Sequence, residues 1–132
     1  MFRTHLARVL VVDDNEMYRD ILLPQYLRVC GFRHITRVED GQQAADLLET
    51  HEQFGLIVTD LEMPKMNGIA LIRQIKDNPL RRHIPVMMVC EPPAGQAEEV
   101  SDFLKQHGVP LLLKRSLSEA GFKAKLRELL KD

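Results

Sequence analysis

The sequence predicts an α/β fold, in which a doubly wound, mainly parallel sheet of five strands carries helices on both faces. Short apolar or β-branched runs alternate five times with amphipathic stretches, which is the pattern of repeated strand–helix units. Most glycine and proline residues fall between these segments or at their edges. We expect one domain over residues 1–132, because a chain of 132 residues is too short for a second.

The five expected strands are short runs of aliphatic or β-branched residues, typical of strands buried in a sheet. In order they are 9–12 (VLVV), 35–38 (ITRV), 56–59 (LIVT), 86–89 (VMMV) and 111–113 (LLL). The run at 9–12 is far too short for a membrane span or for the core of a signal peptide.

The helices expected between and after these strands have apolar residues at helical spacing. In order they cover residues 17–30, 42–49, 69–76, 97–107 and 119–130. The last has the clearest pattern, with Phe122, Leu126, Leu129 and Leu130 on one face and charged residues on the other. Pro24 lies inside the first helical pattern, so we expect that helix to be kinked or split there.

Composition excludes several classes of function. Lys and Arg number 18 against 19 Asp and Glu, so the chain lacks the basic surface that nucleic acid or acidic lipid requires. The two cysteines, Cys30 and Cys90, lie far apart without a CxxC motif, which is typical of reduced thiols in the cytosol. We therefore expect a cytoplasmic protein that contacts neither nucleic acid nor membrane directly.

The residues that follow the first, third, fourth and fifth expected strands have side chains that could form a site. Asp13 and Asp14 follow the first strand, Asp60 the third, Cys90 and Glu91 the fourth, and Lys114 the fifth. Because the carboxyl ends of parallel strands meet at one edge of the sheet, these side chains should gather there. Three carboxylates at one site suit Mg²⁺, and a lysine beside them could hold an anionic group such as a phosphoryl group.

These motifs resemble the receiver domain of bacterial two-component response regulators, of the chemotaxis-regulator kind. The resemblance rests on VVDDN at 11–15, TDLEMPKMNG at 59–68, IPVMMV at 84–89 and Lys114, and it covers essentially the whole chain in order. It implies a flavodoxin-like sheet with strand order 2-1-3-4-5 and five helices.

The resemblance also implies residue roles. Asp60 would be the phosphoacceptor, Asp13 and Asp14 would bind Mg²⁺ (or Mn²⁺) with Asp60 and the backbone carbonyl of Glu62, and Lys114 would contact the phosphoryl oxygens. The donor would be a sensor histidine kinase or a histidine phosphotransfer protein. An output domain or partner protein would bind the face formed by the fourth helix, fifth strand and fifth helix. Such a module is not a turnover enzyme for an external substrate.

Three positions depart from the family pattern. Cys90 stands where receivers usually carry the Thr or Ser that closes on the phosphoryl group, and a thiol is a weak donor. Leu111 stands where the switch aromatic is usual, and Arg115 replaces the proline after Lys114. Because a cis bond before a non-proline residue costs about 3 to 4 kcal/mol, we expect a trans bond with a shifted Lys114 or a strained exception. We hypothesise that the phosphoryl chemistry is kept and its coupling to output is altered.

Other interpretations remain open. The main alternative is a pseudo-receiver, a protein-interaction module that works without phosphorylation. Flavin mononucleotide binding fits poorly, because Asp13 and Asp14 would repel its phosphate, and an aspartyl phosphatase of the haloacid dehalogenase type would need its acidic motif after the first strand. Asp13 and Asp14 alone could simply cap a helix. Cys90 could be a redox sensor, but a small buried residue with a raised thiol pKa is the better interpretation.

Overall fold

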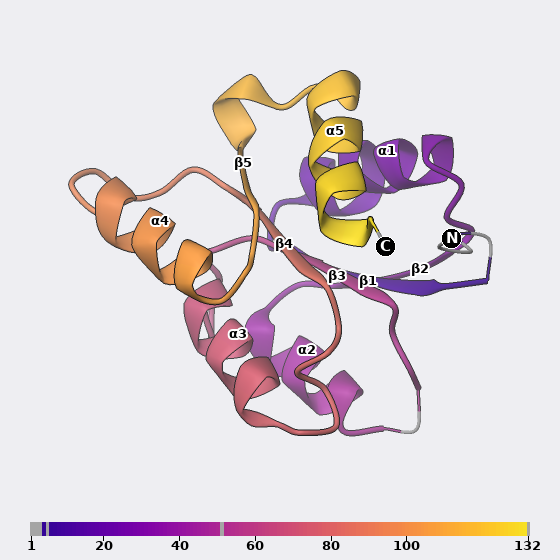
Figure 1. Ribbon diagram of the computed structural model, residues 1–132, viewed down its shortest axis with the longest axis horizontal. Helices are drawn as coiled ribbons and strands as arrows, with labels where there is room; N and C mark the ends of the chain where they lie inside the picture. Colours follow the sequence, from indigo (N-terminus) through magenta and orange to yellow (C-terminus); the bar gives the residue numbers. More distant parts are fainter. Residues whose placement is uncertain (1–3, 5, 51, 132) are drawn as a thin grey trace.

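The computed structural model describes residues 4, 6–50 and 52–131, and its centre is a sheet of five parallel strands (Figure 1). These are β1 (Arg8–Val12), β2 (His34–Val38), β3 (Leu56–Thr59), β4 (Val86–Cys90) and β5 (Leu111–Leu113). Their order is β2-β1-β3-β4-β5 and every neighbouring pair is parallel, so the predicted flavodoxin-like sheet is confirmed. The order reverses between β1 and β3, and ligands of such sheets bind outside the carboxyl ends of the strands at that point.

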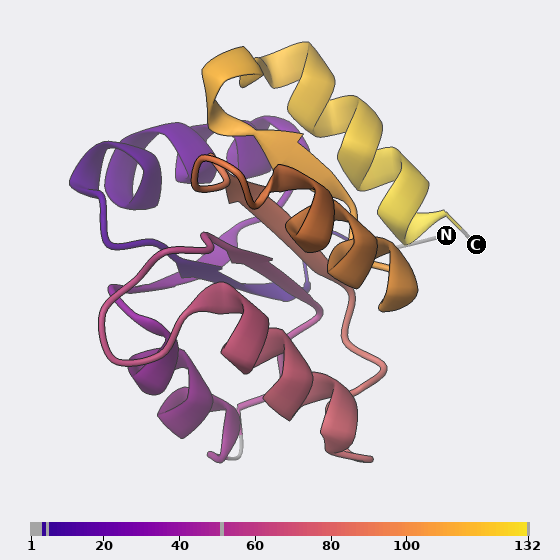
Figure 2. The same ribbon diagram turned by 90° about the vertical axis from the view of Figure 1, so that its left-hand side faces the viewer.

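Among the described residues, five α-helices and two short helical segments lie between and after the strands. They are η1 (Met17–Leu22), α1 (Leu23–Val29), α2 (Gly41–Leu48), α3 (Gly68–Asp77), α4 (Ala97–Gln106), η2 (Lys114–Ser116) and α5 (Glu119–Leu130). In both ribbon views α1 and α5 cover one face of the sheet, while α2 and α3 cover the other (Figures 1 and 2). Within the part of the chain that the structure describes, no helix has the length and apolar character needed to cross a membrane.

The core lies on both faces of the central strands, which explains why those strands are continuous apolar runs. Successive side chains of a strand point to opposite faces. Leu10 and Val12 of β1 therefore join the cluster under α2, α3 and α4, whereas Val9 and Val11 join the cluster under α1 and α5. This burial on two faces anchors the ends of the strands, where the charged residues follow.

The first helix changes geometry at the position that Pro24 predicts. Residues Met17–Leu22 form a π-helical segment, and an α-helix begins at Leu23 with Pro24 in its first turn. Proline has no backbone N–H and fits the first turn of an α-helix, where that donor would have no partner within the helix. The segment expected at 17–30 is thus split into two geometries and ends at Val29.

Candidate functional site

The strand register brings the predicted residues to one edge of the sheet. Val12 of β1 pairs with Thr59 of β3, so the residues that follow them, Asp13 and Asp60, leave the sheet side by side. The backbone N–H of Asp60 donates to the carbonyl of Val12 over 2.8 Å, which fixes the two strand ends together. Cys90, the last residue of β4, and Lys114, which follows β5, lie at the same edge of the sheet.

Three carboxylates form a compact acidic cluster there. One carboxylate oxygen each from Asp13, Asp14 and Asp60 lies within 4.8 Å of the others. Asp13 is fully buried and Asp60 is 7% exposed, whereas Asp14 lies at the surface. One oxygen of Asp13 accepts the N–H of Asn15 over 2.9 Å, and one oxygen of Asp60 accepts the N–H of Leu61 over 2.8 Å. Local backbone donors thus hold the two buried carboxylates in place.

Lys114 contributes the positive charge of the site. Its Nζ lies 3.0 Å from Oδ2 of Asp13 and 3.2 Å from Oδ2 of Asp60. The same ammonium lies 4.2 Å from the centroid of the Tyr18 ring, an attractive cation–π geometry. Burial lowers the pKa of Lys114, but the charges of Asp60 and Asp13 outweigh it and the pKa is raised. Lys114 is therefore charged at neutral pH.

One lysine does not neutralise this pocket. Burial, and next the charge of Asp13, raises the pKa of Asp60 to about 6, against the opposing effect of Lys114. Burial likewise raises the pKa of Asp13. The Lys114 ammonium lies against Oδ2 of Asp13 and Oδ2 of Asp60, so the two buried carboxylates share a single positive charge. With Asp14 beside them, the carboxylates exceed the charge of one ammonium, so the cluster fits a further cation, and hard oxygen ligands favour Mg²⁺.

The loop after Asp60 is shaped by the residues that follow it. Gly68 begins α3, and its N–H donates to the carbonyl of Leu61 over 2.8 Å. A Cβ at Gly68 would collide with the backbone oxygen of Asp60, so only glycine fits there. Glu62 lies in this loop with an exposed side chain. Its role as a carbonyl ligand stays a prediction.

The structure also shows the surroundings of the three positions that depart from the family pattern, Cys90, Leu111 and Arg115. Cys90 is fully buried in the core under α4, and burial, with the Asp60 charge next, raises its thiol pKa to about 12. The expectations of a buried side chain and a raised pKa are both confirmed. Leu111 is half-buried against the same core. Every peptide bond among the described residues is trans, including the bond between Lys114 and Arg115, and Lys114 still reaches both aspartates.

Two features of the site were missed from the sequence. Tyr18 covers the lysine ammonium, and Glu91 binds Arg115 across the two loops that follow β4 and β5. The sequence could have indicated the Glu91–Arg115 contact, because these residues carry opposite charges and come just after neighbouring strands. Nothing in the local sequence around Tyr18 indicates that its ring faces Lys114.

The fold and the strand-end site together define the receiver class of α/β signalling proteins. Residues 9–126 match the family described as the response regulator receiver domain, and the chain belongs to this family. Receiver domains belong to two-component systems and are signalling modules rather than enzymes with an external substrate.

Similar proteins agree with this assignment. The chain is 29% identical over 119 residues to a chemotaxis protein CheY homolog of Campylobacter jejuni, covering 85% of this chain and 90% of that protein. It is 37% identical over 82 residues to the chemotaxis protein CheY of Pseudomonas aeruginosa, covering 62% and 64%. A crystal structure of a response regulator receiver protein from Pseudomonas putida superposes with a TM-score of 0.77 at 26% identity, covering 92% and 96%. The CheY4 structure of Vibrio cholerae superposes with a TM-score of 0.78 at 22% identity, covering 94% and 98%.

Proposed function

We propose that Asp60 accepts a phosphoryl group from a phosphohistidine of a sensor histidine kinase or a histidine phosphotransfer protein. The observation that carries this proposal is the position of the Asp60 carboxylate at the end of a buried strand, clustered with Asp13 and Asp14 and 3.2 Å from the Lys114 ammonium. A carboxylate with a pKa of about 6 is ionised in most molecules at neutral pH, so it is available as a nucleophile.

In the transfer step, a carboxylate oxygen of Asp60 attacks the phosphorus and forms the new O–P bond. The P–N bond to the donor histidine breaks, and its electron pair stays on the ring nitrogen. The ring, protonated on its other nitrogen, leaves as neutral imidazole. Lys114 neutralises negative charge on the phosphoryl oxygens from its place beside Asp60. The acyl phosphate formed is labile, so the modification is temporary.

The acidic cluster would hold the metal ion that this chemistry uses. Asp13, Asp14 and Asp60 supply carboxylate oxygens, and the Glu62 backbone carbonyl is a further proposed ligand. Bound Mg²⁺ (or Mn²⁺) would supply positive charge toward the phosphoryl oxygens. Two observations support this assignment: Asp13 and Asp60 share the single charge of Lys114, and the pKa of Asp60 is raised to about 6. Both reflect negative charge that Lys114 leaves uncompensated.

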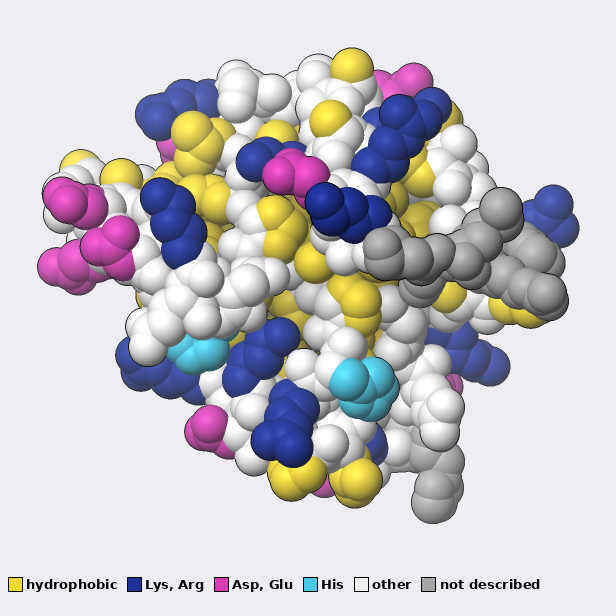
Figure 3. Space-filling view, in the orientation of Figure 1, with side chains coloured by type: hydrophobic (Ala, Val, Ile, Leu, Met, Phe, Trp, Pro, Cys, Tyr) yellow, Lys and Arg dark blue, Asp and Glu magenta, His cyan; other side chains and the backbone are white. Residues whose placement is uncertain are grey.

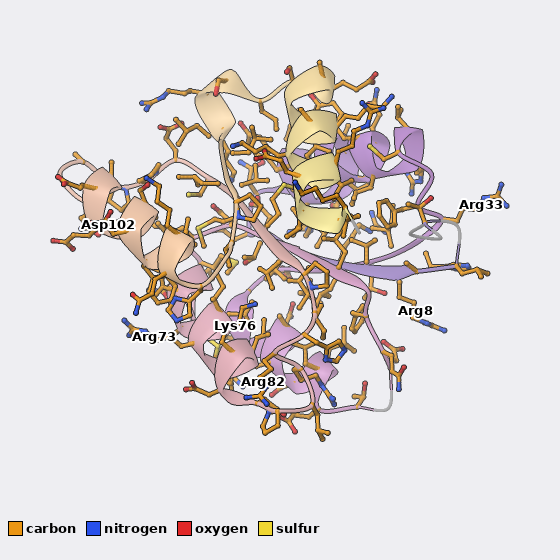
Figure 4. The ribbon with its side chains drawn as sticks, viewed as in Figure 1. Arg8, Arg33, Arg73, Lys76, Arg82 and Asp102 are labelled. Atoms are coloured by element: carbon orange, nitrogen blue, oxygen red, sulfur yellow. The ribbon has the colours of Figure 1, made fainter. Side chains whose placement is uncertain are left out.

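The proposed output surface is the face formed by α4, β5 and α5. β5 is the last strand of the sheet, so one of its edges has no neighbouring strand among the described residues. Acidic side chains gather over α4, where Asp102 is labelled, and basic side chains lie over α3 with Arg73 and Lys76 (Figures 3 and 4). The two helices meet where the Arg73 guanidinium lies 5.1 Å from the centroid of the Phe103 ring.

Coupling of that face to phosphorylation is the part in which this chain differs. The Cys90 thiol keeps its proton at neutral pH and is a weak donor, and Leu111 supplies no ring that could rotate. Losing a hydrogen bond to a charged group costs about 1.5 to 3 kcal/mol. That loss favours the second candidate, an interaction module whose partner binding does not depend on phosphate.

The intact mass of the protein after incubation with acetyl phosphate and Mg²⁺ tests the proposal. We expect one phosphoryl adduct in the natural chain and none in Asp60→Asn, which keeps the shape of the side chain but is a far weaker nucleophile. An adduct that persists in Asp60→Asn would place the acceptor elsewhere. Failure of both acetyl phosphate and a cognate kinase to form an adduct would refute the phosphoacceptor role and favour the interaction module.

A further inference from the structure

Glu91 and Lys114 leave the sheet at neighbouring positions. Cys90, the last residue of β4, pairs with Leu113, the last residue of β5. The next residues, Glu91 and Lys114, therefore emerge side by side at the edge where the acidic cluster lies. From there the Glu91 carboxylate reaches the residue after the lysine: its Oε1 accepts the backbone N–H of Arg115 over 3.0 Å.

With this hydrogen bond, both polar groups of one peptide have a partner. The peptide between Lys114 and Arg115 accepts the N–H of Leu117 at its carbonyl oxygen over 3.2 Å, and it donates its own N–H to Glu91. Both polar groups of the peptide are therefore bonded, and the peptide is trans. The short turn η2 has no side-chain cap from its own N-cap residue, Leu113, so Glu91 supplies a cap from another element.

The lysine side chain that starts from this peptide ends among three partners. Its Nζ is placed against Asp13, Asp60 and the ring of Tyr18. A lysine side chain has four rotatable bonds, so the place of its ammonium depends on where the backbone starts it. Members of the family usually have a proline after this lysine, which fixes the backbone covalently. Arg115 cannot do so, and its N–H is instead held by Glu91.

We propose that Glu91 is a positioning residue for Lys114, and that it acts through the backbone N–H of Arg115. The proposal rests on the proposed phosphoacceptor function. Glu91 also forms an ion pair with the Arg115 guanidinium, Oε2 to Nη1 over 3.1 Å. The Arg115 side chain is 70% exposed and that of Glu91 41%, so this pair contributes little. The hydrogen bond to the backbone carries the effect.

Three variants and one control separate the backbone hydrogen bond from the charge. Glu91→Ala removes both, Glu91→Gln keeps an oxygen that can accept the Arg115 N–H, and Arg115→Ala keeps the N–H but removes the ion pair. Glu128→Ala is the matched control, because it deletes a glutamate from the exposed pair with Lys125 in α5. We expect the rate of adduct formation from acetyl phosphate to fall about tenfold or more in Glu91→Ala, since a small displacement of a reacting group has effects of that size. Glu91→Gln and Arg115→Ala should stay within about threefold of the natural chain, and Glu128→Ala should match it.

A second measurement follows the lysine without any phosphorylation. The Tyr18 ring should shift the NMR signals of the Lys114 side-chain methylene next to Nζ, because the ammonium lies 4.2 Å from the ring centroid. Tyr18→Leu removes that shift and so identifies the signal. In Glu91→Ala we expect the signal to move toward the position of an exposed lysine, and in Glu91→Gln we expect it to stay.

The two measurements together decide the proposal. A slow rate and a displaced lysine signal in Glu91→Ala, with both restored in Glu91→Gln, would support it. Equal losses in Glu91→Ala and Glu91→Gln would show that the charge matters rather than the bond, and would overturn it, as would an unchanged Glu91→Ala. If the natural chain forms no adduct, the proposed function fails, and the lysine signal alone decides whether Glu91 positions Lys114.

Discussion

Lowering the pH from about 7.5 to about 5 should weaken Mg²⁺ binding at the acidic cluster. The reason is competition with protons, because Mg²⁺ binds the ionised carboxylates. Burial and the charge of Asp13 raise the pKa of Asp60 to about 6, so its proton is bound well above the usual range of an aspartate. Asp13 shifts in the same direction through its own burial. Protonation of either residue removes a ligand.

The size of the effect follows from the pKa of Asp60. At about pH 5, a carboxyl with a pKa of about 6 is ionised in about one molecule in ten, whereas at about pH 7.5 nearly all molecules are ionised. The apparent Kd for Mg²⁺ should therefore rise about tenfold from Asp60 alone. Protonation of Asp13 would add to this change.

The same pKa fixes the sign of the effect on stability. Because the folded protein binds this proton more tightly than the unfolded chain, Asp60 favours the fold below about pH 4, and that contribution is lost as the pH rises through about 6. A pKa moved from 3.8 to about 6 corresponds to about 3 kcal/mol. Mg²⁺ should offset part of this loss, so it should raise the Tm clearly at about pH 7.5 and little at about pH 5.

Calorimetric titration with MgCl₂ at three pH values and constant ionic strength, with thermal melting alongside, tests both statements. Asp60→Asn is the control, because it lacks the titrating group and should bind Mg²⁺ more weakly but with a shallower pH dependence. A Kd that is the same at about pH 5 and about pH 7.5, or that is lower at the acidic pH, would contradict the electrostatic description of the site.

Three further predictions concern single positions. Lys114→Met should slow adduct formation from acetyl phosphate by about a hundredfold. Calorimetry at neutral pH should show that this variant binds Mg²⁺ no more weakly than the natural chain. An unchanged rate would show that Lys114 takes no part in the mechanism. Cys90→Thr should extend the amide shift changes caused by beryllofluoride and Mg²⁺ into α4, compared with the natural chain, and identical spectra would show that this position does not limit coupling. Gly68→Ala should lower the free energy of unfolding by about 1 to 3 kcal/mol, because the added Cβ meets the backbone oxygen of Asp60. Gly121→Ala is the comparison and should lose less, because the nearest atom there is the Ser118 hydroxyl oxygen at 3.1 Å. Equal denaturant midpoints would argue against that close approach.

The elements that the sequence predicted well are those whose pattern comes directly from burial. The strands at 56–59 and 111–113 and the helix at 119–130 have the predicted bounds. Other bounds moved by one residue because of interactions outside the hydrophobic pattern. α3 begins at Gly68, not at 69, because the Asn67 side chain caps it by accepting the N–H of Ala70. β4 extends to Cys90 because its backbone pairs with Leu113.

The candidate site was predictable to the extent that it depends on topology. In a parallel sheet, residues that follow strands must meet at one edge, so Asp13, Asp60 and Lys114 could be grouped without coordinates. The distances between these side chains did not follow from that rule. The two contacts of the lysine ammonium at 3.0 and 3.2 Å require one side-chain conformation, which the surrounding packing selects.

The sequence by itself determined the α/β class, the family and the set of residues at the strand ends, because hydrophobic periodicity and motif spacing are local properties of the chain. Only the tertiary structure decided how Lys114 is held. Tyr18 in η1 places its ring against the Lys114 ammonium, and Glu91 in the loop after β4 accepts the backbone N–H of the next residue, Arg115. Both contacts join residues far apart in the chain. Such contacts depend on the register of the strands and on the rotamers that packing allows, and neither is written in any short segment of the sequence.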